Sequence, residues 1–365
     1  MDSDSDLFIK IPVQTITMCK LLLTILGFAF LQQTFAQPYV FYKGKQIIVK
    51  TLDSNIVNTE VFPVSEKEQV SVNVRFRNNK SWNFSVNLKA FGNDSTEFNP
   101  SDTILFLSDI EGEFGLLRQL LISNGVINEH YEWTFGHGQL IICGDLLDRG
   151  KGVTQELWLL YKLEILAPAQ GGSVHVLLGN HEIMELSGDL RYLDPGYYQQ
   201  ARLLNKDYMD LFSDDTELGR WLRSKNIILK TGIFLCTHGG ISREVLDRKM
   251  SIESINERVR PFYDQWRKDI PPNLDVFFNE NSPFWYRGYF DKPNDKQKLV
   301  AATLERYNAK KIIVGHTEFL EVESYYHGQV WNINTNWHVG NAQGLLVEHD
   351  KFYRVDSDGI RMLME

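Results

Sequence analysis

Hydrophobic and polar residues alternate between positions 70 and 88 in the pattern of antiparallel β-strands. Every second residue is hydrophobic from Val70 to Phe76 and again from Trp82 to Leu88, and the polar segment RNNK separates the two runs. Asparagine tolerates the backbone angles of tight turns, so this pattern predicts a β-hairpin. We expect residues 37–100 to form a small β-rich segment, and the turn-rich stretch 90–102 to link it to the rest of the chain.

From residue 103 onward, short hydrophobic runs alternate with segments whose hydrophobic positions repeat every three to four residues. The leucines between positions 116 and 121 fall on one face of a helix that is expected to end at Gly125, and residues 153–166 repeat the pattern. Alternating strands and helices predict an α/β domain over residues 101–365. The mostly polar and helical stretch at about 185–226 is expected to be an insert beside the functional site.

The N-terminal region has the pattern of a secretory signal peptide. Lys20 precedes a hydrophobic run from Leu21 to Leu31, and small residues lead to a cleavage position near Ala36–Gln37. The residues before Met18 are acidic, which suits a signal poorly, so Met18 is the expected start within the leader region 1–36. The hydrophobic run is short for a bilayer span. We therefore expect a periplasmic or secreted protein with no membrane span after cleavage, with an uncleaved anchor as the alternative.

Composition and charge narrow the class of partner. The chain has 365 residues, is 43% hydrophobic and 23% charged, and carries a formal net charge of −9. These values are typical of a globular protein, and the negative charge argues against a nucleic-acid partner, which needs a basic surface. After the leader only Cys143 and Cys236 remain, both in hydrophobic runs, and we expect two buried free thiols rather than a disulfide.

Five separate hydrophobic runs end in a residue that can bind a metal ion. The runs end at Asp109, Asp145, Asn180, His238 and His316. A single Asp after a strand is usually a helix cap, but ligand sites of open α/β sheets collect at the carboxyl ends of strands. Five such ends supply enough carboxylate, amide and imidazole groups for two divalent cations that share a bridging ligand.

The motifs around these residues carry a family resemblance. GDLLDRG (144–150), GNHE (179–182), HGG (238–240) and GHT (315–317) occur in the order found in calcineurin-like metallophosphatases, which the chain resembles. The first two motifs resemble the phosphoprotein-phosphatase branch, and GNHEIMELSGDLRYL and SPFWYRGYF resemble the bacterial Shewanella-like phosphatases. The resemblance covers roughly residues 103–350. It implies a four-layer α/β/β/α sandwich of two mixed sheets, so that residues 101–365 would be the catalytic domain.

The resemblance also implies a role for each of the five strand-end residues. Asp109 would bind the first metal and Asp145 would bridge both, while Asn180, His238 and His316 would complete the ligands of the second metal. The two cations would hold a bridging hydroxide that attacks phosphorus in line. They would be Mn²⁺, with Mg²⁺, Fe or Zn²⁺ as alternatives.

Four further residues would act on the substrate. His181 would protonate the leaving oxygen, and Asp148 would hold its other nitrogen. Arg149 and Arg287 would clamp the phosphoryl oxygens, with Asn180 also facing the substrate. Arg287 lies among aromatic residues (282–290), so mere stacking on those rings is the alternative reading of this residue.

One position departs from the family pattern. The first motif of the family is Asp-x-His, whereas this chain has Asp109-Ile110-Glu111. Glu111 can still bind metal, and its oxygen suits Mn²⁺ or Mg²⁺. The additional negative charge is expected to raise the pKa of metal-bound water and give a more alkaline optimum. The alternative is a catalytically weak pseudo-phosphatase that binds a phospho-ligand.

The sequence therefore predicts a metal-dependent phosphatase that acts on phosphorylated protein, on Tyr or on Ser/Thr. A dinucleoside polyphosphate or another small phosphoester is the alternative substrate. Most other histidines have no motif context, although His338, in NTNWHVGN, lies near the expected C-terminal strands. Glu113 is expected to begin a helix rather than to bind metal.

Overall fold

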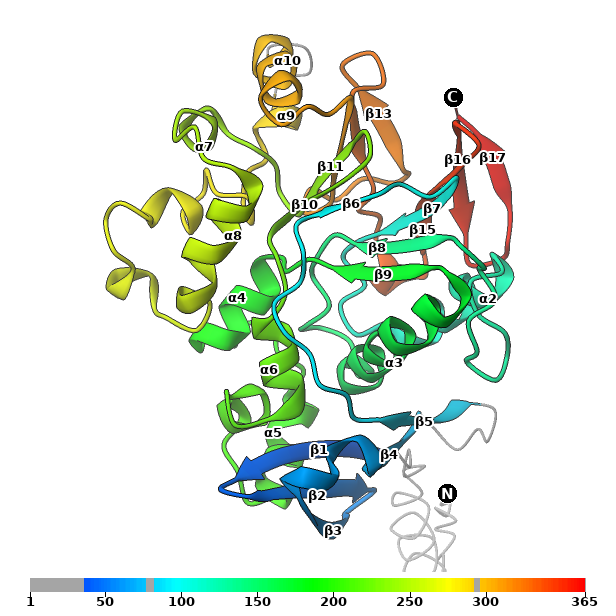
Figure 1. Ribbon diagram of the computed structural model, residues 1–365, viewed down its shortest axis with the longest axis vertical. Helices are drawn as coiled ribbons and strands as arrows, with labels where there is room; N and C mark the ends of the chain where they lie inside the picture. Colours follow the sequence, from blue (N-terminus) through cyan, green and yellow to red (C-terminus); the bar gives the residue numbers. More distant parts are fainter. Residues whose placement is uncertain (1–35, 77–81, 292–295, 365) are drawn as a thin grey trace, which may run out of the picture.

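A computed structural model describes residues 36–76, 82–291 and 296–364. Within these ranges the strands form one five-stranded sheet and two six-stranded sheets (Figure 1). The predicted signal peptide, with the proposed start at Met18, and the predicted turn at 77–80 lie outside the described residues.

The N-terminal sheet is antiparallel, with the strand order β3-β2-β1-β4-β5. The predicted hairpin is confirmed, because Val72 lies opposite Val86 and Val74 opposite Phe84, all with buried side chains. The strands between residues 36 and 87 of the predicted β-rich segment thus form a sheet of their own at one end of the molecule (Figure 1), whereas Glu97–Phe98, within the predicted linker, pair as a short strand with a mixed sheet. The strands of the N-terminal sheet are β1 Ala36–Lys43, β2 Gln46–Asp53, β3 Ile56–Pro63, β4 Ser71–Arg75 and β5 Asn83–Asn87.

The two larger sheets are mixed, and every strand-end residue of the prediction follows one of their strands. One has the order β17-β16-β15-β7-β8-β9 and the other β13-β14-β12-β11-β10-β6. The strands of the first are β7 Thr103–Leu107, β8 Gln139–Ile142, β9 Ser173–Val176, β15 Gln343–Glu348, β16 Lys351–Asp356 and β17 Arg361–Leu363. The strands of the second are β6 Glu97–Phe98, β10 Ile228–Thr231, β11 Phe234–Thr237, β12 Lys311–Val314, β13 Glu323–Tyr325 and β14 Val330–Asn332.

The two mixed sheets pack face to face because their central strands are hydrophobic on both sides. In β7, Ile104 and Phe106 belong to the core between the sheets, where Phe106 packs against Phe234 with ring centroids 5.2 Å apart. Leu105 and Leu107 point to the opposite side and join the core beneath the helices. This two-sided burial is typical of strands inside layered α/β folds. The predicted four-layer α/β/β/α architecture is confirmed.

Helices cover the outer faces of the mixed sheets, with α3 against β9 and α8 against β10 (Figure 1). The predicted helix at 116–121 is confirmed as α2: Leu117, Leu120 and Leu121 are fully buried, Leu116 is partly buried, and the helix is followed by Gly125 at φ +74°. The α-helices outside the insert are α2 Phe114–Ser123, α3 Val153–Leu166, α7 Arg243–Leu246, α8 Ile252–Val259, α9 Gly288–Asp291 and α10 Gln297–Arg306.

The stretch predicted as a helical insert lies between the N-terminal sheet and the mixed sheets. Its elements are α4 Asn180–Ser187, α5 Pro195–Leu203, the short 3-10 helix η4 Tyr208–Phe212 and α6 Glu217–Arg223. Asp194 caps α5 by accepting a hydrogen bond from the Gly196 N–H at 2.7 Å. The helix α6 packs on β1, and the Tyr39 hydroxyl of β1 donates to Gln200 of α5 at 2.9 Å. The insert thus ties the N-terminal sheet to the rest of the molecule.

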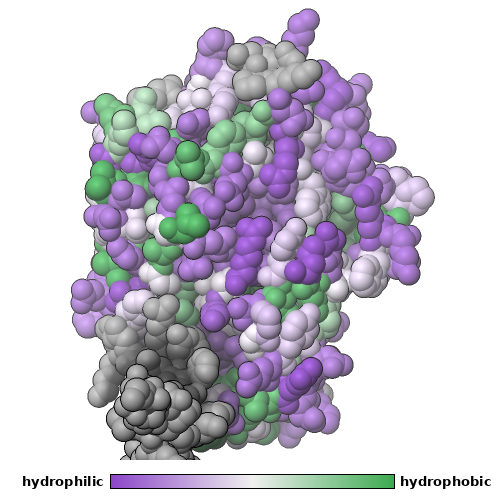
Figure 2. Space-filling model, turned by 180° about the vertical axis from the view of Figure 1, so that it is seen from behind, coloured by the Kyte–Doolittle hydropathy of each residue, from purple (hydrophilic) through white to green (hydrophobic). Residues whose placement is uncertain are grey.

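The face opposite to that of Figure 1 is mostly hydrophilic, with hydrophobic residues in small separate groups (Figure 2). Among the described residues, no helix combines the length and the apolar character needed to cross a bilayer. Cys143 and Cys236 are both free and buried, as the sequence predicts, and both lie in the core between the two mixed sheets.

Candidate metal centre

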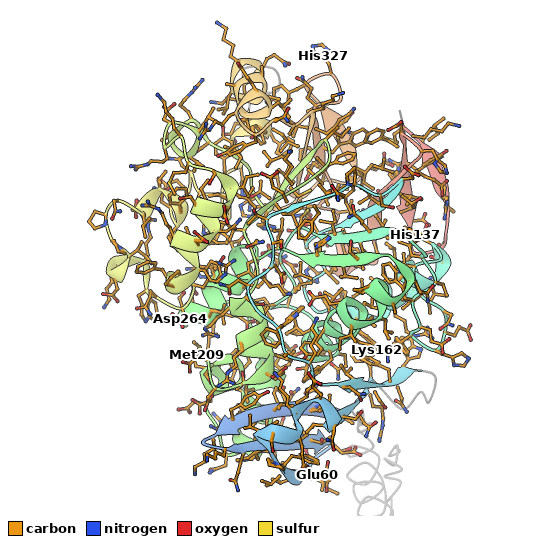
Figure 3. All side chains as sticks on the ribbon, viewed as in Figure 1. Glu60, His137, Lys162, Met209, Asp264 and His327 are labelled. Carbon is orange, nitrogen blue, oxygen red and sulfur yellow. The ribbon has the colours of Figure 1, made fainter. Side chains whose placement is uncertain are left out.

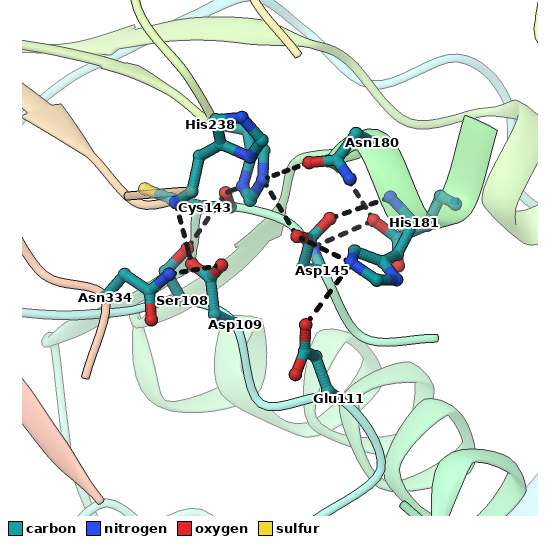
Figure 4. Close-up of polar contacts among 12 residues, drawn as sticks. Ser108, Asp109, Glu111, Cys143, Asp145, Asn180, His181, His238 and Asn334 are labelled. Carbon is teal, nitrogen blue, oxygen red and sulfur yellow. Dashed lines mark hydrogen bonds and ion pairs between the residues drawn. The ribbon is translucent and has the colours of Figure 1, made fainter. Parts of the chain in front are cut away.

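The predicted metal ligands converge where five strands end. Figure 4 shows four of them, Asp109, Asp145, Asn180 and His238, close together. Three of these strands, β7, β8 and β9, run parallel in one mixed sheet, and β11 and β12 run parallel in the other. The sandwich therefore brings both sets of strand ends to the same place. The residues that follow these strands are all buried, with at most 6% exposure: Asp109, Asp145, Asn180, His238 and His316.

Asp145 lies at the centre of this group. Its Oδ2 is 3.0 Å from His238 Nε2, and its Oδ1 accepts a hydrogen bond from the backbone N–H of His181 at 2.9 Å. His238 Nε2 is also 3.0 Å from Asn180 Oδ1. The other ring nitrogen, Nδ1, donates to the Cys143 carbonyl at 2.8 Å. That bond fixes the orientation of the ring, so Nε2 is the atom that faces the ligand group.

Asp109 is held by neighbours that sequence reasoning missed. Its Oδ2 accepts hydrogen bonds from the Ser108 hydroxyl at 2.6 Å and from the His316 N–H at 3.0 Å. Its Oδ1 accepts one from Asn334 Nδ2 at 2.7 Å. Asn334 follows β14, more than two hundred residues further along the chain. It stands in no recognisable motif, so only the folded structure could identify it.

Glycines make room for the carboxylates. A Cβ atom at Gly179 would lie 2.2 Å from Asp145 Oδ1, and one at Gly315 would lie 2.4 Å from Asp109 Oδ2. Both distances are far inside van der Waals contact. The glycines of GNHE and GHT are therefore required by the close approach of backbone to ligand oxygen.

The arrangement of donor atoms fits two divalent cations. Ligand atoms of Asp145, His238 and His316 lie within 4.8 Å of one another, and so do those of Glu111, Asp145 and His181. Asp145 belongs to both groups, as a bridging ligand must. His316 Nε2 is buried without any hydrogen-bond partner, which is the state of a nitrogen placed to bind a metal. Asp109 stands beside these groups without joining either of them.

The electrostatics of the site follow from crowded buried carboxylates. Burial raises the pKa of Asp109 to about 7, and the charges of Asp145 and Glu111 add to this effect. Burial lowers the pKa of His316 to about 2, with His238 acting in the same sense. Burial alone would lower the pKa of His238, but the charges of Asp145 and Asp109 outweigh burial and raise this pKa to about 10. The carboxylates thus favour a positive charge on His238, whereas the His316 ring stays neutral, as a metal ligand must be.

His181 and Asp148 form a tight pair at the edge of the centre. His181 Nδ1 donates to Asp148 Oδ2 at 2.6 Å, and Asp148 is fully buried. His181 Nε2 lies 3.4 Å from Glu111 Oε1 and 3.8 Å from Asp145 Oδ2. Burial lowers the pKa of His181, but Asp145 and the bond to Asp148 outweigh it and raise the pKa to about 9. This is the geometry of an oriented general acid.

Glu111, the residue that departs from the family motif, is surrounded by cationic groups. Its Oε2 accepts a hydrogen bond from Arg149 Nη1 at 2.6 Å and contacts His338 Nε2. Arg149 also packs over the Tyr192 ring, 5.3 Å from its centroid. The structure therefore places Arg149 on a protein carboxylate, whereas the predicted phosphoryl clamp needs a free guanidinium. Arg287, the second predicted clamp, donates to the His316 carbonyl at 2.7 Å.

The histidines without motif context fall into different places. His338 joins the site through Glu111 and lies 3.6 Å from Glu113. His175 is buried in β9, where its ring lies 3.7 Å from that of Phe98. His137 and His327 are exposed and lie at the periphery of the molecule (Figure 3). Only His338 among these four is a functional candidate, and its place near the C-terminal strands was the one signal in the sequence.

Glu182 of the GNHE motif holds the ligand loops together. Its Oε2 accepts hydrogen bonds from the N–H groups of Asp145 at 2.9 Å and Gly179 at 2.7 Å. Its Oε1 accepts from Leu146 at 2.7 Å and Leu147 at 2.9 Å. One fully buried carboxylate therefore fixes the backbone on both sides of the centre. Sequence reasoning gave this residue no role.

A cavity of about 350 Å³ adjoins the metal centre. The ring of Trp285, which lines it, lies 5.7 Å from that of His316, and Met184 Sδ is 3.8 Å from Asn180 Nδ2. The lining combines aromatic and aliphatic side chains with charged ones. The residues concerned are Ile183, Met184, Trp266, Phe278 and Trp285 on the apolar side, with Arg191, Arg267, Asp189 and Glu280 among the charged.

Comparison with known proteins decides the family. The family description "calcineurin-like phosphoesterase" matches residues 102–317, more than half of the chain. The chain belongs to the calcineurin-like phosphoesterase family. It is 26% identical to Shewanella-like protein phosphatase 1 of Plasmodium berghei over 262 residues, 66% of this chain and 70% of that protein. It is 34% identical to Shewanella-like protein phosphatase 2 of Arabidopsis thaliana over 98 residues, 27% of this chain and 25% of that protein.

The fold is similar to that of a cold-active protein-tyrosine phosphatase from a psychrophilic Shewanella species. The two superpose with a TM-score of 0.83 and 32% identity, covering 91% of this chain and 99% of the other. The predicted resemblance to Shewanella-like phosphatases is confirmed. Coverage of 91% is more than residues 103–350 alone could supply, so the likeness reaches beyond the residues to which the motifs confined it. Calcineurin-like phosphoesterases use divalent metals, and this one has two overlapping groups of candidate ligands.

Proposed function

We propose that this phosphoesterase hydrolyses phosphomonoesters with the help of two divalent cations, and that its substrates are phosphorylated proteins. The observation that carries the proposal is the His181–Asp148 pair, whose His181 Nε2 faces Glu111 and Asp145 where the two ligand groups overlap. Asp145, His238, His316 and Asn180 would hold one cation, and Asp145, Glu111 and Asp109 the other. Bound divalent cations polarise phosphoryl oxygens and lower the pKa of water.

The protein's own groups would handle the proton and the charge of the phosphoryl group. His181 would deliver a proton from Nε2 to the leaving oxygen, while Nδ1 stays bonded to Asp148. Arg287 is exposed at the site and lies near Asp109 and Asp145, where its charge would stabilise phosphoryl oxygens. Arg149 would serve the same purpose after exchanging Glu111 for the substrate.

We propose phosphotyrosine as the preferred residue, on the basis of the cavity beside the metal centre. Trp285 and Trp266 provide aromatic surface, and the 55% exposure of Trp266 leaves that surface open to an incoming side chain. The structurally similar Shewanella enzyme is a protein-tyrosine phosphatase. Trp266→Ala should raise KM for an aryl phosphate roughly two- to tenfold, since an aromatic pair contributes about 0.5–1.5 kcal/mol beyond its buried area. Leu320→Ala, at an exposed site, is the control.

We further propose that the metal is Mn²⁺ and that the protein acts outside the cytoplasm. Support for the metal comes from Glu111, since an additional carboxylate favours a cation that prefers oxygen ligands. Support for export comes from the leader pattern of residues 18–36. The N-terminal peptide of the protein recovered outside the cytoplasm, identified by mass spectrometry, should begin at Gln37.

The function is tested by a substrate panel with metal analysis. Purified protein loaded with Mn²⁺ should hydrolyse phosphotyrosyl peptide and aryl phosphate, and His181→Ala should lose most turnover while it keeps its metal. His137→Ala, at an exposed histidine far from the centre, should behave like the wild type. A preference for a dinucleoside polyphosphate would reassign the substrate. No hydrolysis by metal-loaded wild type between pH 6 and pH 10 would leave the phospho-ligand-binding alternative.

A further inference from the structure

Glu185 is a buried acid that the proposed reaction does not use directly. It lies on α4 one turn after His181 and is 3% exposed. Its Oε2 accepts a hydrogen bond from the Tyr208 hydroxyl of η4. Its Oε1 is buried and has no donor within hydrogen-bond reach. An acid in this position needs a partner for that second oxygen.

Asp148 also has one buried carboxylate oxygen without a hydrogen-bond donor. Its Oδ2 holds His181 Nδ1, but its Oδ1 is buried and also lacks a donor. The charge of Asp148 and a side-chain hydrogen bond with Asp148 are among the causes that raise the pKa of Glu185, so the two carboxyl groups are close neighbours. Two carboxyl groups that face each other in a buried space cannot both be ionised at little cost. A single proton between them would satisfy both unpartnered oxygens at once.

The position of that proton follows from the surroundings of the two acids. Burial raises the pKa of Glu185 well above its usual value, and the charge of Asp148 acts in the same direction. Asp148, by contrast, accepts a 2.6 Å bond from an imidazole, which favours its ionised form. The proton therefore belongs to Glu185. Tyr208 cannot fill this role for Asp148, because its hydroxyl proton is already donated to the other Glu185 oxygen.

We propose that Glu185 is a positioning residue, which donates a hydrogen bond from its carboxyl group to Asp148 and thereby orients His181. The chain of contacts runs from Tyr208 through Glu185 and Asp148 to His181. It joins the helical insert to the proton-delivering group of the site. The role rests on the proposed function of His181, but the protonation of Glu185 does not.

Two substitutions at position 185 separate hydrogen bonding from charge. Glu185→Gln keeps the shape, donates an N–H to Asp148 and accepts from Tyr208, so kcat should stay within about threefold of the wild type. Glu185→Leu leaves Asp148 Oδ1 without a donor. An unsatisfied buried acceptor costs enough for kcat to fall roughly ten- to a hundredfold, while KM and bound Mn²⁺ change less than about twofold. Rates on an aryl phosphate and elemental analysis give these values.

An infrared difference spectrum tests the protonation without using activity. At pH 8 the wild type should show the carbonyl band of a protonated carboxylic acid that Glu185→Gln lacks. Absence of this band from the difference overturns the proposal, as does a Glu185→Gln enzyme that is as impaired as Glu185→Leu. Wild-type kcat in Glu185→Leu also overturns it. If the band is present and the wild type turns over no substrate, the shared proton stands and the proposed function has failed.

Discussion

The four hydrogen bonds that converge on Glu182 make this residue the sharpest test of how the centre is built. All four donors are backbone N–H groups, and they come from the loops after β8 and β9, at 2.7–2.9 Å. Glu182→Gln keeps the size of the side chain but leaves one acceptor oxygen. The new NH₂ group would face two N–H donors at the position of the lost oxygen. Two of the four bonds are therefore lost and replaced by repulsive contacts.

The size of the effect follows from those two bonds. A hydrogen bond to a charged group contributes about 1.5–3 kcal/mol, so the loss amounts to about 3–6 kcal/mol. Set against a typical total stability of about 5–15 kcal/mol, this is a large fraction. For a chain of this size, about 2 °C of Tm per kcal/mol gives an expected decrease of about 6–12 °C. Mn²⁺ affinity should fall as well, because Asp145 is one of the four residues whose N–H is held.

Glu156 provides a matched control on α3. It too is fully buried, but burial raises its pKa well above the usual value, with the nearby charge of Glu182 second. Burial therefore favours the neutral form of Glu156, and Glu156→Gln, which keeps the shape of that form, should change the free energy of unfolding by less than about 1 kcal/mol. Differential scanning calorimetry of both variants in EDTA measures folding apart from metal binding. Equal Tm losses in the two variants would refute the reasoning, because burial alone would then explain the effect.

Three further predictions concern pH, metal and the altered motif. Burial lowers the pKa of His175 to about 4 from 6.5. As the pH falls, His175 is therefore protonated in the unfolded chain at a higher pH than in the folded protein. Between pH 7 and pH 4 the wild type should lose about 3 kcal/mol that His175→Phe does not lose, as measured by urea unfolding. Mn²⁺ at a hundred times its Kd should add about 2.7 kcal/mol of stability per site. Asp145→Asn should abolish this gain, and the exposed Asp350→Asn should keep it. Glu111→His, which restores the family motif, should lower the optimum of kcat by about one pH unit and favour Zn²⁺ over Mn²⁺; an unchanged profile would show that Glu111 does not act on the metal site.

The sequence predicts the ligands of the candidate centre better than the residues that hold them. Asp109, Asp145 and His316 each follow a hydrophobic run, and the rule that strand ends meet at one sheet edge needs no knowledge of distant contacts. Asn334 and His338 approach the centre from beyond β14, and no local periodicity marks them. Long-range contacts of this kind depend on how two sheets pack.

The same limit applies to the N-terminal sheet. The local alternation of hydrophobic and polar side chains predicts its hairpin, and that part of the prediction is confirmed. Its attachment depends on single contacts such as Tyr39 to Gln200 and the Tyr42 hydroxyl to Glu217 at 2.5 Å. These pairs are separated by more than 150 residues. A pattern read along the chain therefore finds the sheet but cannot find what it packs against.

The backbone of the centre explains why the ligands and their supports occur together. Fifteen non-glycine residues in the described ranges have left-handed φ, and six of them are predicted site residues: Asp109, Glu111, Asp145, Asp148, Arg149 and His316. Asp and His tolerate this conformation better than most residues, but each instance still costs on the order of 1 kcal/mol. Such a conformation persists only where neighbours fix it. Here the Asp109 N–H donates to the Gly144 carbonyl at 3.0 Å and the Glu111 N–H to the Asp145 carbonyl at 3.1 Å. The first two motif loops thus hold each other in this strained form, and their mutual hydrogen bonds fix where the carboxylates of Asp109, Glu111 and Asp145 lie.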